Sequence, residues 1–256
     1  MKLFITLALL FSSTLTAALP APSNTVDPET IVNSPIYQAY KGAFSANIGG
    51  SSENSIVTRN DLIDGKCNDV IVIFARGSTE PGNIGITLGP VFFDAIEKVE
   101  PGRIITQGVN DYPASVSSSA SCTKDLLATL LTKSKISEAL AGGSKTGAKY
   151  MASMVSLAAS QCPESKVVLS GYSQGAQVTH LAAGYIPEDL YSKVAAIVLF
   201  GDPDDGDAFP GSLNDNVATF CKDGDRICEG FPIPSVVHFT YQNDVGKAAV
   251  YIAERV

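Results

Sequence analysis

The chain is short of basic residues. Its 256 residues include 18 Lys and Arg against 26 Asp and Glu, so the formal net charge is −8 at pH 7. Proteins that bind nucleic acid neutralise phosphates with clustered positive charge, and the sequence has no cluster of Lys and Arg. The composition therefore argues against nucleic acid as a partner and against polyanionic substrates, and it suits a protein that acts on uncharged material.

Metal ligands are also scarce. The chain has two histidines, His180 and His238, and five cysteines that form no Cys-x-x-Cys pair. Zinc sites take three or four ligands from His, Cys and acidic side chains, commonly at such short spacings. We therefore expect no metal site.

Long apolar runs are absent beyond the first residues. Leu3–Leu10 is too short to span a bilayer, and it lies between Lys2 and the small residues Thr16-Ala17-Ala18. This order of charged, apolar and small residues is typical of a secretory signal peptide. We predict an extracellular protein without stable membrane insertion, divided into a signal peptide over 1–18, a pro-segment or flexible arm over 19–58, and one catalytic domain over 59–256.

What is present is an alternation of strand and helix patterns. The apolar, β-branched run Asp69–Ala75 is typical of a strand buried on both faces. Further strands are predicted over Arg103–Val109, Lys166–Ser170, Val194–Phe200 and Val217–Phe220. Helices are predicted over Pro90–Val99, Ser121–Ala141, Thr146–Gln161, Gln174–Ala183 and Val245–Arg255. The alternation predicts an α/β fold, with a doubly wound parallel sheet at the centre of a three-layer α/β/α sandwich.

The cysteines are expected to form disulfides, because the chain carries a predicted signal peptide. Cys67 and Cys162 each lie just before a predicted strand, so a bridge between them is geometrically plausible if those strands are neighbours. Cys221 and Cys228 would close a short loop. Cys122 is left over, either as a free buried thiol or as an intermolecular link.

The segment Gly171-Tyr172-Ser173-Gln174-Gly175 lies between a predicted strand and a predicted helix. Reactive groups of parallel α/β sheets gather at the C-terminal ends of the strands. Gly-x-Ser-x-Gly in this context is typical of a nucleophile elbow, where the two glycines let the strand and the helix pass closely. We interpret Ser173 as a nucleophile rather than as part of a simple turn.

A serine nucleophile needs a base, and the base needs an acid to orient it. His180 is seven residues beyond Ser173 on the same predicted helix, about 10 Å along the axis, which is out of hydrogen-bond reach. His238 follows the last predicted strand, as the order Ser–acid–His requires. The sequence therefore predicts His238 as the base and His180 as a structural or surface residue.

The acid is expected between Ser173 and His238. Asp225 follows a predicted strand and lies between Cys221 and Cys228, so a disulfide would hold its carboxylate in place. Asp202, which follows the strand predicted over Val194–Phe200, is the alternative.

Several blocks of this sequence together resemble the cutinase family of secreted fungal serine esterases. The resemblance runs from about Cys67 to the C-terminus, with its blocks in the family's order. They are Phe74-Ala75-Arg76-Gly77-Ser78-Thr79-Glu80, Gln107-Gly108-Val109, Gln161-Cys162-Pro163, Gly171-Tyr172-Ser173-Gln174-Gly175-Ala176, Cys221-x-x-Gly224-Asp225-x-x-Cys228 and His238. The resemblance implies the triad Ser173, Asp225 and His238, and the bridges Cys67–Cys162 and Cys221–Cys228.

An oxyanion hole is expected from the same segments. Gln174, the residue after the nucleophile, lies at a predicted helix N-terminus and can donate its backbone N–H to a developing oxyanion. Ser78 lies in the loop after the first strand, where the family uses a backbone N–H and a hydroxyl group. No organic cofactor is implied, because the triad and the backbone supply the chemistry.

The residues around His238 are apolar. We predict that Phe231, Ile233, Pro234 and Phe239 contact the acyl chain, and that Tyr112-Pro113 and Val116 form the opposite wall. The predicted function is hydrolysis of cutin-like polyester and short-chain lipid esters by a monomeric enzyme. Two alternatives stay open: an acetylxylan esterase, which Gly201-Asp202-Pro203 also resembles, and a non-catalytic secreted binder.

Overall fold

The structure is a computed structural model that describes residues 57–114, 142–231 and 234–256. Several features predicted from the sequence lie outside these ranges: the signal peptide, almost all of the 19–58 arm, the helix over Ser121–Ala141, Val116, Cys122 and Ile233.

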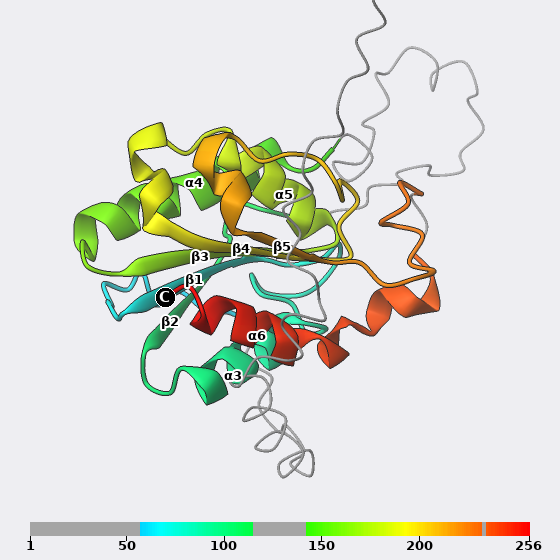
Figure 1. The fold of residues 1–256 in the computed structure, drawn as a ribbon, viewed down its shortest axis with the longest axis horizontal. Helices are drawn as coiled ribbons and strands as arrows, with labels where there is room; N and C mark the ends of the chain where they lie inside the picture. The colour runs from blue at the N-terminus through cyan, green and yellow to red at the C-terminus, as the bar shows by residue number, and fades with distance from the viewer. Residues whose placement is uncertain (1–56, 115–141, 232–233) are drawn as a thin grey trace, which may run out of the picture.

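A five-stranded parallel sheet forms the centre of the molecule (Figure 1). The strand order is β2-β1-β3-β4-β5, and each neighbouring pair runs parallel. The strands are β1 Val70–Ala75, β2 Ile104–Gly108, β3 Lys166–Tyr172, β4 Val194–Phe200 and β5 Val217–Phe220. The sheet confirms the predicted fold class, and the strand bounds agree with the sequence prediction to within two residues.

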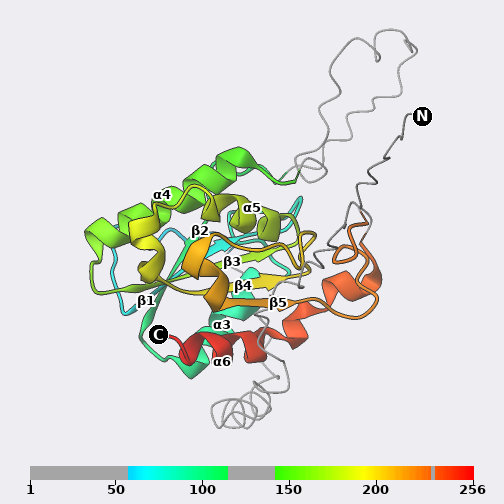
Figure 2. The same ribbon diagram turned by 45° about the horizontal axis from the view of Figure 1, so that its top comes forward.

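Helices cover both faces of the sheet, which gives the three layers (Figures 1 and 2). α4 (Lys145–Gln161) and α5 (Gln174–Ala183) lie on one face, and α3 (Gly89–Val99) and α6 (Val245–Ala253) lie on the other. Short 3₁₀ helices occupy Glu188–Lys193, Gly211–Asn216, Val236–Phe239 and Tyr241–Asn243. No helix within the described ranges is long and apolar enough to cross a membrane.

Strand β1 shows why this sequence is buried on both sides. All six of its residues are buried, and successive side chains alternate between the two faces. Ile71 and Ile73 join the core beneath α4 and α5, whereas Val72 and Phe74 join the core beneath α3 and α6. An apolar run without polar alternation therefore has a core to fill on each face.

The strand order changes direction between β1 and β3, which are paired in the sheet although β2 and α4 separate them in sequence. Ligands of open α/β sheets bind where the strand order reverses, outside the C-terminal ends of the strands. Those ends carry the loop after Ala75 and the turn at Ser173. At the other end of the sheet, just before the N-terminal ends of β1 and β3, Cys67 and Cys162 form a disulfide with a Cα–Cα distance of 5.6 Å.

Candidate active site

Ser173 stands on a strained turn between β3 and α5. Its backbone has φ of 57° and ψ of −123°, a region that non-glycine residues rarely adopt. A Cβ at Gly171 would lie 2.2 Å from the Gly175 carbonyl oxygen, and one at Gly175 would lie 2.0 Å from the Ala75 carbonyl oxygen. Both glycines are therefore needed for the turn that holds the half-buried Ser173 at the end of the strand.

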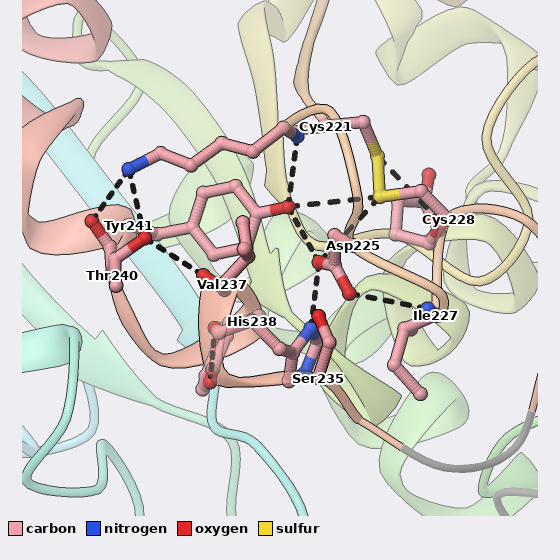
Figure 3. Close-up of polar contacts among 12 residues, drawn as sticks. Cys221, Asp225, Ile227, Cys228, Ser235, Val237, His238, Thr240 and Tyr241 are labelled. Atoms are coloured by element: carbon pink, nitrogen blue, oxygen red, sulfur yellow. Dashed lines mark hydrogen bonds and ion pairs between the residues drawn. A yellow bond between two sulfur atoms is a disulfide. The ribbon is translucent and has the colours of Figure 1, made fainter.

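Asp225 and His238 are joined by a direct hydrogen bond (Figure 3). His238 Nδ1 lies 2.8 Å from Asp225 Oδ2, and both residues are almost fully buried. Because Nδ1 is taken up by the carboxylate, Nε2 is the ring nitrogen left for a serine hydroxyl.

A short disulfide-closed loop holds Asp225. Cys221 and Cys228 are bonded, and inside the loop the Asp225 backbone N–H donates to the Lys222 carbonyl oxygen at 2.9 Å. Ile227 donates its N–H to Asp225 Oδ1 at 3.1 Å. The loop thus fixes the carboxylate through its own backbone as well as through the disulfide.

The His238 ring lies against the same structure that holds Ser173. Tyr172, the residue before Ser173, stacks on this ring at 5.1 Å and donates its hydroxyl to the His238 carbonyl oxygen at 2.9 Å. A Cβ at Gly201 would lie 2.7 Å from His238 Cε1, and Gly201 follows Phe200, whose carbonyl oxygen accepts the Ser173 N–H at 2.9 Å. These contacts place the His238–Asp225 pair beside the serine turn.

Ser78 and Gln174, the predicted oxyanion-hole residues, contact each other. Ser78 Oγ donates to Gln174 Oε1 at 3.0 Å. Gln174 is the first residue of α5, so its backbone N–H belongs to the set that has no partner inside the helix. The Gln174 side chain is buried, and its Nε2 has no hydrogen-bond partner in the described part of the chain.

Glu80 organises the loop that carries Ser78, a role that the sequence did not reveal. Its Oε2 accepts the Gly77 N–H at 2.9 Å, and its Oε1 accepts the N–H groups of Ile86 and Thr87 at 3.1 and 2.7 Å. One carboxylate thus closes the loop after β1 onto the segment that leads into α3. The only sequence signal was its place in the block with Ser78.

Tyr241 is a second residue that sequence reasoning missed. Its hydroxyl donates to Asp225 Oδ2 at 2.6 Å, and the side chain is buried. Burial, reinforced by the hydrogen bond to the Asp225 carboxylate, raises the pKa of Tyr241 well above its ordinary value. The phenol therefore stays protonated and acts as a donor.

The second histidine belongs to a separate pair. His180 Nε2 lies 2.8 Å from Asp202 Oδ2, and the His180 ring stacks on Phe209 at 4.2 Å. Burial disfavours the charged ring, but the hydrogen bond to Asp202 and the charges of Asp202, Asp204 and Asp207 outweigh it and raise the pKa of His180. Asp202, the alternative triad acid, is thus engaged by His180, while Asp225 contacts His238.

Apolar side chains are exposed before and after His238 in the chain, and the Phe239 ring stands edge-on to His238 with centroids 5.7 Å apart. Phe231 and Phe239 are 46% and 51% exposed, and Pro234 is also exposed. Tyr112, predicted on the opposite wall, is buried, and its hydroxyl donates to the Arg76 carbonyl oxygen. Across residues 57–114, 142–231 and 234–256, no group of three or more His, Cys, Asp or Glu side chains is placed to hold a metal ion.

Known proteins resemble this chain over most of its length. The cutinase family model matches residues 66–256. A cutinase from Coprinopsis cinerea is 42% identical over 190 residues, which cover 74% of this chain and 85% of that protein. A cutinase from Botryotinia fuckeliana is 38% identical over 186 residues, with coverage of 73% and 82%.

Solved structures give the same picture. A Trichoderma reesei cutinase in complex with a phosphonate inhibitor has a TM-score of 0.64 and 33% identity, and the match covers 88% of this chain and 90% of that one. An acetylxylan esterase has a TM-score of 0.55 and 22% identity, with coverage of 74% and 98%, which shows a shared fold alone.

Proposed function

Because the chain belongs to the cutinase family of serine esterases, we propose that it hydrolyses cutin-like polyester and short-chain lipid esters outside the cell. The observation that carries the proposal is the buried hydrogen bond between His238 Nδ1 and Asp225 Oδ2 beside the strained turn at Ser173. The two disulfides and the predicted signal peptide support an extracellular location.

In the proposed reaction, Ser173 Oγ attacks the carbonyl carbon of the ester while His238 Nε2 takes the hydroxyl proton. Asp225 stabilises the imidazolium that forms. The carbonyl oxygen becomes an oxyanion, which the Gln174 backbone N–H and the Ser78 loop stabilise. His238 then returns the proton to the departing alcohol oxygen, and the acyl group remains on Ser173.

The second half of the reaction uses the same groups. Water loses a proton to His238 Nε2 and attacks the acyl carbon, and the oxyanion forms again in the same place. When the bond to Ser173 Oγ breaks, His238 returns the proton to the serine. The products are one alcohol and one carboxylic acid, and the enzyme is restored.

The exposed apolar side chains near His238 support an aliphatic acyl group as the substrate. An acetylxylan esterase of the same family is the second candidate, supported by the segment Gly201-Asp202-Pro203. The acyl-chain preference separates the two. A non-catalytic binder has no need of the buried Asp225–His238 pair or of a strained serine turn.

The proposal is tested by labelling with a fluorophosphonate probe and by turnover of p-nitrophenyl esters, cutin and acetylated xylan. We expect covalent labelling at Ser173, and loss of activity by about 10⁴-fold or more in Ser173→Ala. Ser153→Ala on the exposed side of α4 is the matched control and should be active. Full activity in Ser173→Ala, or no labelling of a folded wild-type protein, would exclude a serine mechanism at this site.

A further inference from the structure

The Tyr241 hydroxyl lies where the Asp225 loop meets the segment that carries His238 (Figure 3). It donates to Asp225 Oδ2 at 2.6 Å and accepts the Lys222 backbone N–H at 3.1 Å. Lys222 and Asp225 both belong to the loop closed by the disulfide Cys221–Cys228. One buried phenol thus joins the loop through a donor and an acceptor.

Tyr241 and His238 share one carboxylate oxygen. Both donate to Asp225 Oδ2, whereas Oδ1 accepts the Ile227 N–H at 3.1 Å. The Tyr241 ring also stands edge-on to His238, with centroids 6.1 Å apart, and a Cβ at Gly201 would lie 2.8 Å from its Cε2. The phenol has little room to move, so it fixes the direction in which Oδ2 faces the imidazole.

We propose that Tyr241 is a positioning residue of the triad: its hydroxyl holds Asp225 Oδ2 against His238 and sets how strongly the carboxylate favours the imidazolium. The inference rests on the proposed function. A hydrogen bond to an ionised carboxylate stabilises the charged form. When that donor is removed, the carboxylate gains affinity for a proton, and the coupled His238–Asp225 pair binds its proton more tightly.

Other charged and titratable groups face the pair. Lys222 Nζ lies 5.4 Å from the Tyr241 ring centroid and forms an ion pair with Asp244 at 2.9 Å. The Tyr172 ring stacks on His238, and burial, followed by the charges of Glu80 and Asp225, raises the pKa of Tyr172 well above its ordinary value. None of these groups donates to Oδ2, so they do not replace the Tyr241 hydroxyl.

The first test is Tyr241→Phe, which keeps the ring and removes the hydroxyl. We expect kcat to fall roughly tenfold with little change in KM, because Asp225 Oδ2 is no longer held in line with His238 Nδ1 and the imidazole is oriented less well in the transition state. The acidic limb of the kcat/KM profile should move to higher pH, because His238 must be neutral to act as the base. A role in packing alone would lower the thermal midpoint and leave this limb in place.

Tyr251→Phe is the matched control. Tyr251 is also buried, on α6, and none of the hydrogen bonds of Asp225 and His238 in the described part of the chain involves its hydroxyl. The same loss of one oxygen should therefore leave kcat and the pH profile as in the wild type. In an Asp225→Asn background, Tyr241→Phe should change the rate of fluorophosphonate labelling less than twofold, because the two side chains act through one contact.

A second variant, with 3-fluorotyrosine incorporated at position 241, retains the hydroxyl and its hydrogen bonds. It tests the proposal even if Tyr241→Phe fails to fold. Fluorine makes the phenol a stronger donor, so the acidic limb should move to lower pH, opposite to the shift in Tyr241→Phe. An active wild type whose acidic limb stays unchanged in both variants overturns this inference alone. A folded wild type with no esterase activity overturns the proposed function, and this inference with it.

Discussion

Ser78 Oγ donates a 3.0 Å hydrogen bond to the side-chain oxygen of Gln174, 96 residues further along the chain. Ser78 lies in the loop after β1, and Gln174 begins the helix after β3. These strands are neighbours in the sheet, so their C-terminal ends bring the two residues together. The contact uses the single proton of the Ser78 hydroxyl, so it holds the Ser78 loop against the start of α5, and the hydroxyl must turn from Gln174 Oε1 to the oxyanion when a substrate binds.

Ser78→Ala should therefore lower kcat by about 10²-fold, with a smaller change in KM, because the loss falls on the charge of the transition state. Steady-state kinetics with p-nitrophenyl butyrate measures both constants. Thr79→Ala is the control, since Thr79 Oγ1 is exposed and, among the residues that the structure describes, bonds only to the neighbouring Ser78 carbonyl oxygen. A wild-type kcat in Ser78→Ala would show that the Ser78 hydroxyl does not stabilise the oxyanion.

Glu80→Gln tests the carboxylate that holds the Ser78 loop. The amide has one acceptor oxygen where Glu80 has two, and its NH₂ group faces N–H donors. Hydrogen bonds to charged groups contribute about 1.5–3 kcal/mol each, so we expect a loss of stability of at least this size, and a kcat several-fold lower. Thermal unfolding and turnover give the two values.

Glu97→Gln supplies the comparison for Glu80. Glu97 is exposed on α3, and its Oε1 accepts a single backbone N–H, that of Gly102, at 2.8 Å. Glu97→Gln should lower the free energy of unfolding by less than about 1 kcal/mol and leave kcat unchanged. Equal effects of the two substitutions would show that Glu80 has no special part in ordering the Ser78 loop.

The fold was open to prediction because its signals are local. The structure gives β4 (Val194–Phe200) and α5 (Gln174–Ala183) the bounds that the sequence predicts. An unbroken apolar run and a helix that begins in a Gly-x-Ser-x-Gly turn each depend on neighbouring residues. The last helix is two residues shorter than predicted, ending at Ala253. The 3₁₀ helix that carries His238 was not predicted, because such a short turn leaves no periodic pattern.

The candidate triad was open to prediction for another reason. The order of Ser173, Asp225 and His238 and the cysteines around Asp225 are visible in the sequence. Tyr241 and Glu80 were missed because each acts through a partner that only folding brings near. Tyr241 is 16 residues from Asp225, and nothing in the spacing marks the contact.

The His180–Asp202 pair predicts how stability depends on pH. The folded state favours the charged imidazole, so the stabilisation is complete below the ordinary histidine pKa of about 6.5 and is lost as pH rises through the raised pKa of His180. One such group changes the slope by at most about 1.4 kcal/mol per pH unit. Thermal midpoints between pH 6 and 8 should therefore fall less steeply in His180→Gln, which stays neutral.

Turnover provides the second readout for His180. Because His180 is bonded to Asp202 and not to Asp225, His180→Gln should keep kcat within about twofold of the wild type at pH 7, whereas His238→Ala should lose about 10⁴-fold. A wild-type pH slope in His180→Gln would contradict the charged pair. A large loss of turnover would contradict the assignment of His238 as the base.

The exposed rings of Phe231 and Phe239 predict the choice of acyl group. Phe231 and Phe239 are about half exposed, so a bound acyl chain can cover them. Arg226 lies over the Phe231 ring at 4.4 Å and holds it in place. A polysaccharide deacetylase would instead need polar groups for the sugar and a small acyl pocket.

We therefore expect kcat/KM for p-nitrophenyl butyrate to exceed that for the acetate ester by roughly tenfold, since each buried methylene contributes about 0.8 kcal/mol. Cutin should release hydroxy fatty acids. Replacing Phe231 and Phe239 with Ser should remove the preference for butyrate, whereas Tyr185→Ser, an equally exposed aromatic beyond the end of α5, should retain it. A wild-type enzyme that prefers acetate and deacetylates xylan would show that these rings do not bind the acyl chain, and would favour acetylxylan esterase activity from the same Ser173, Asp225 and His238.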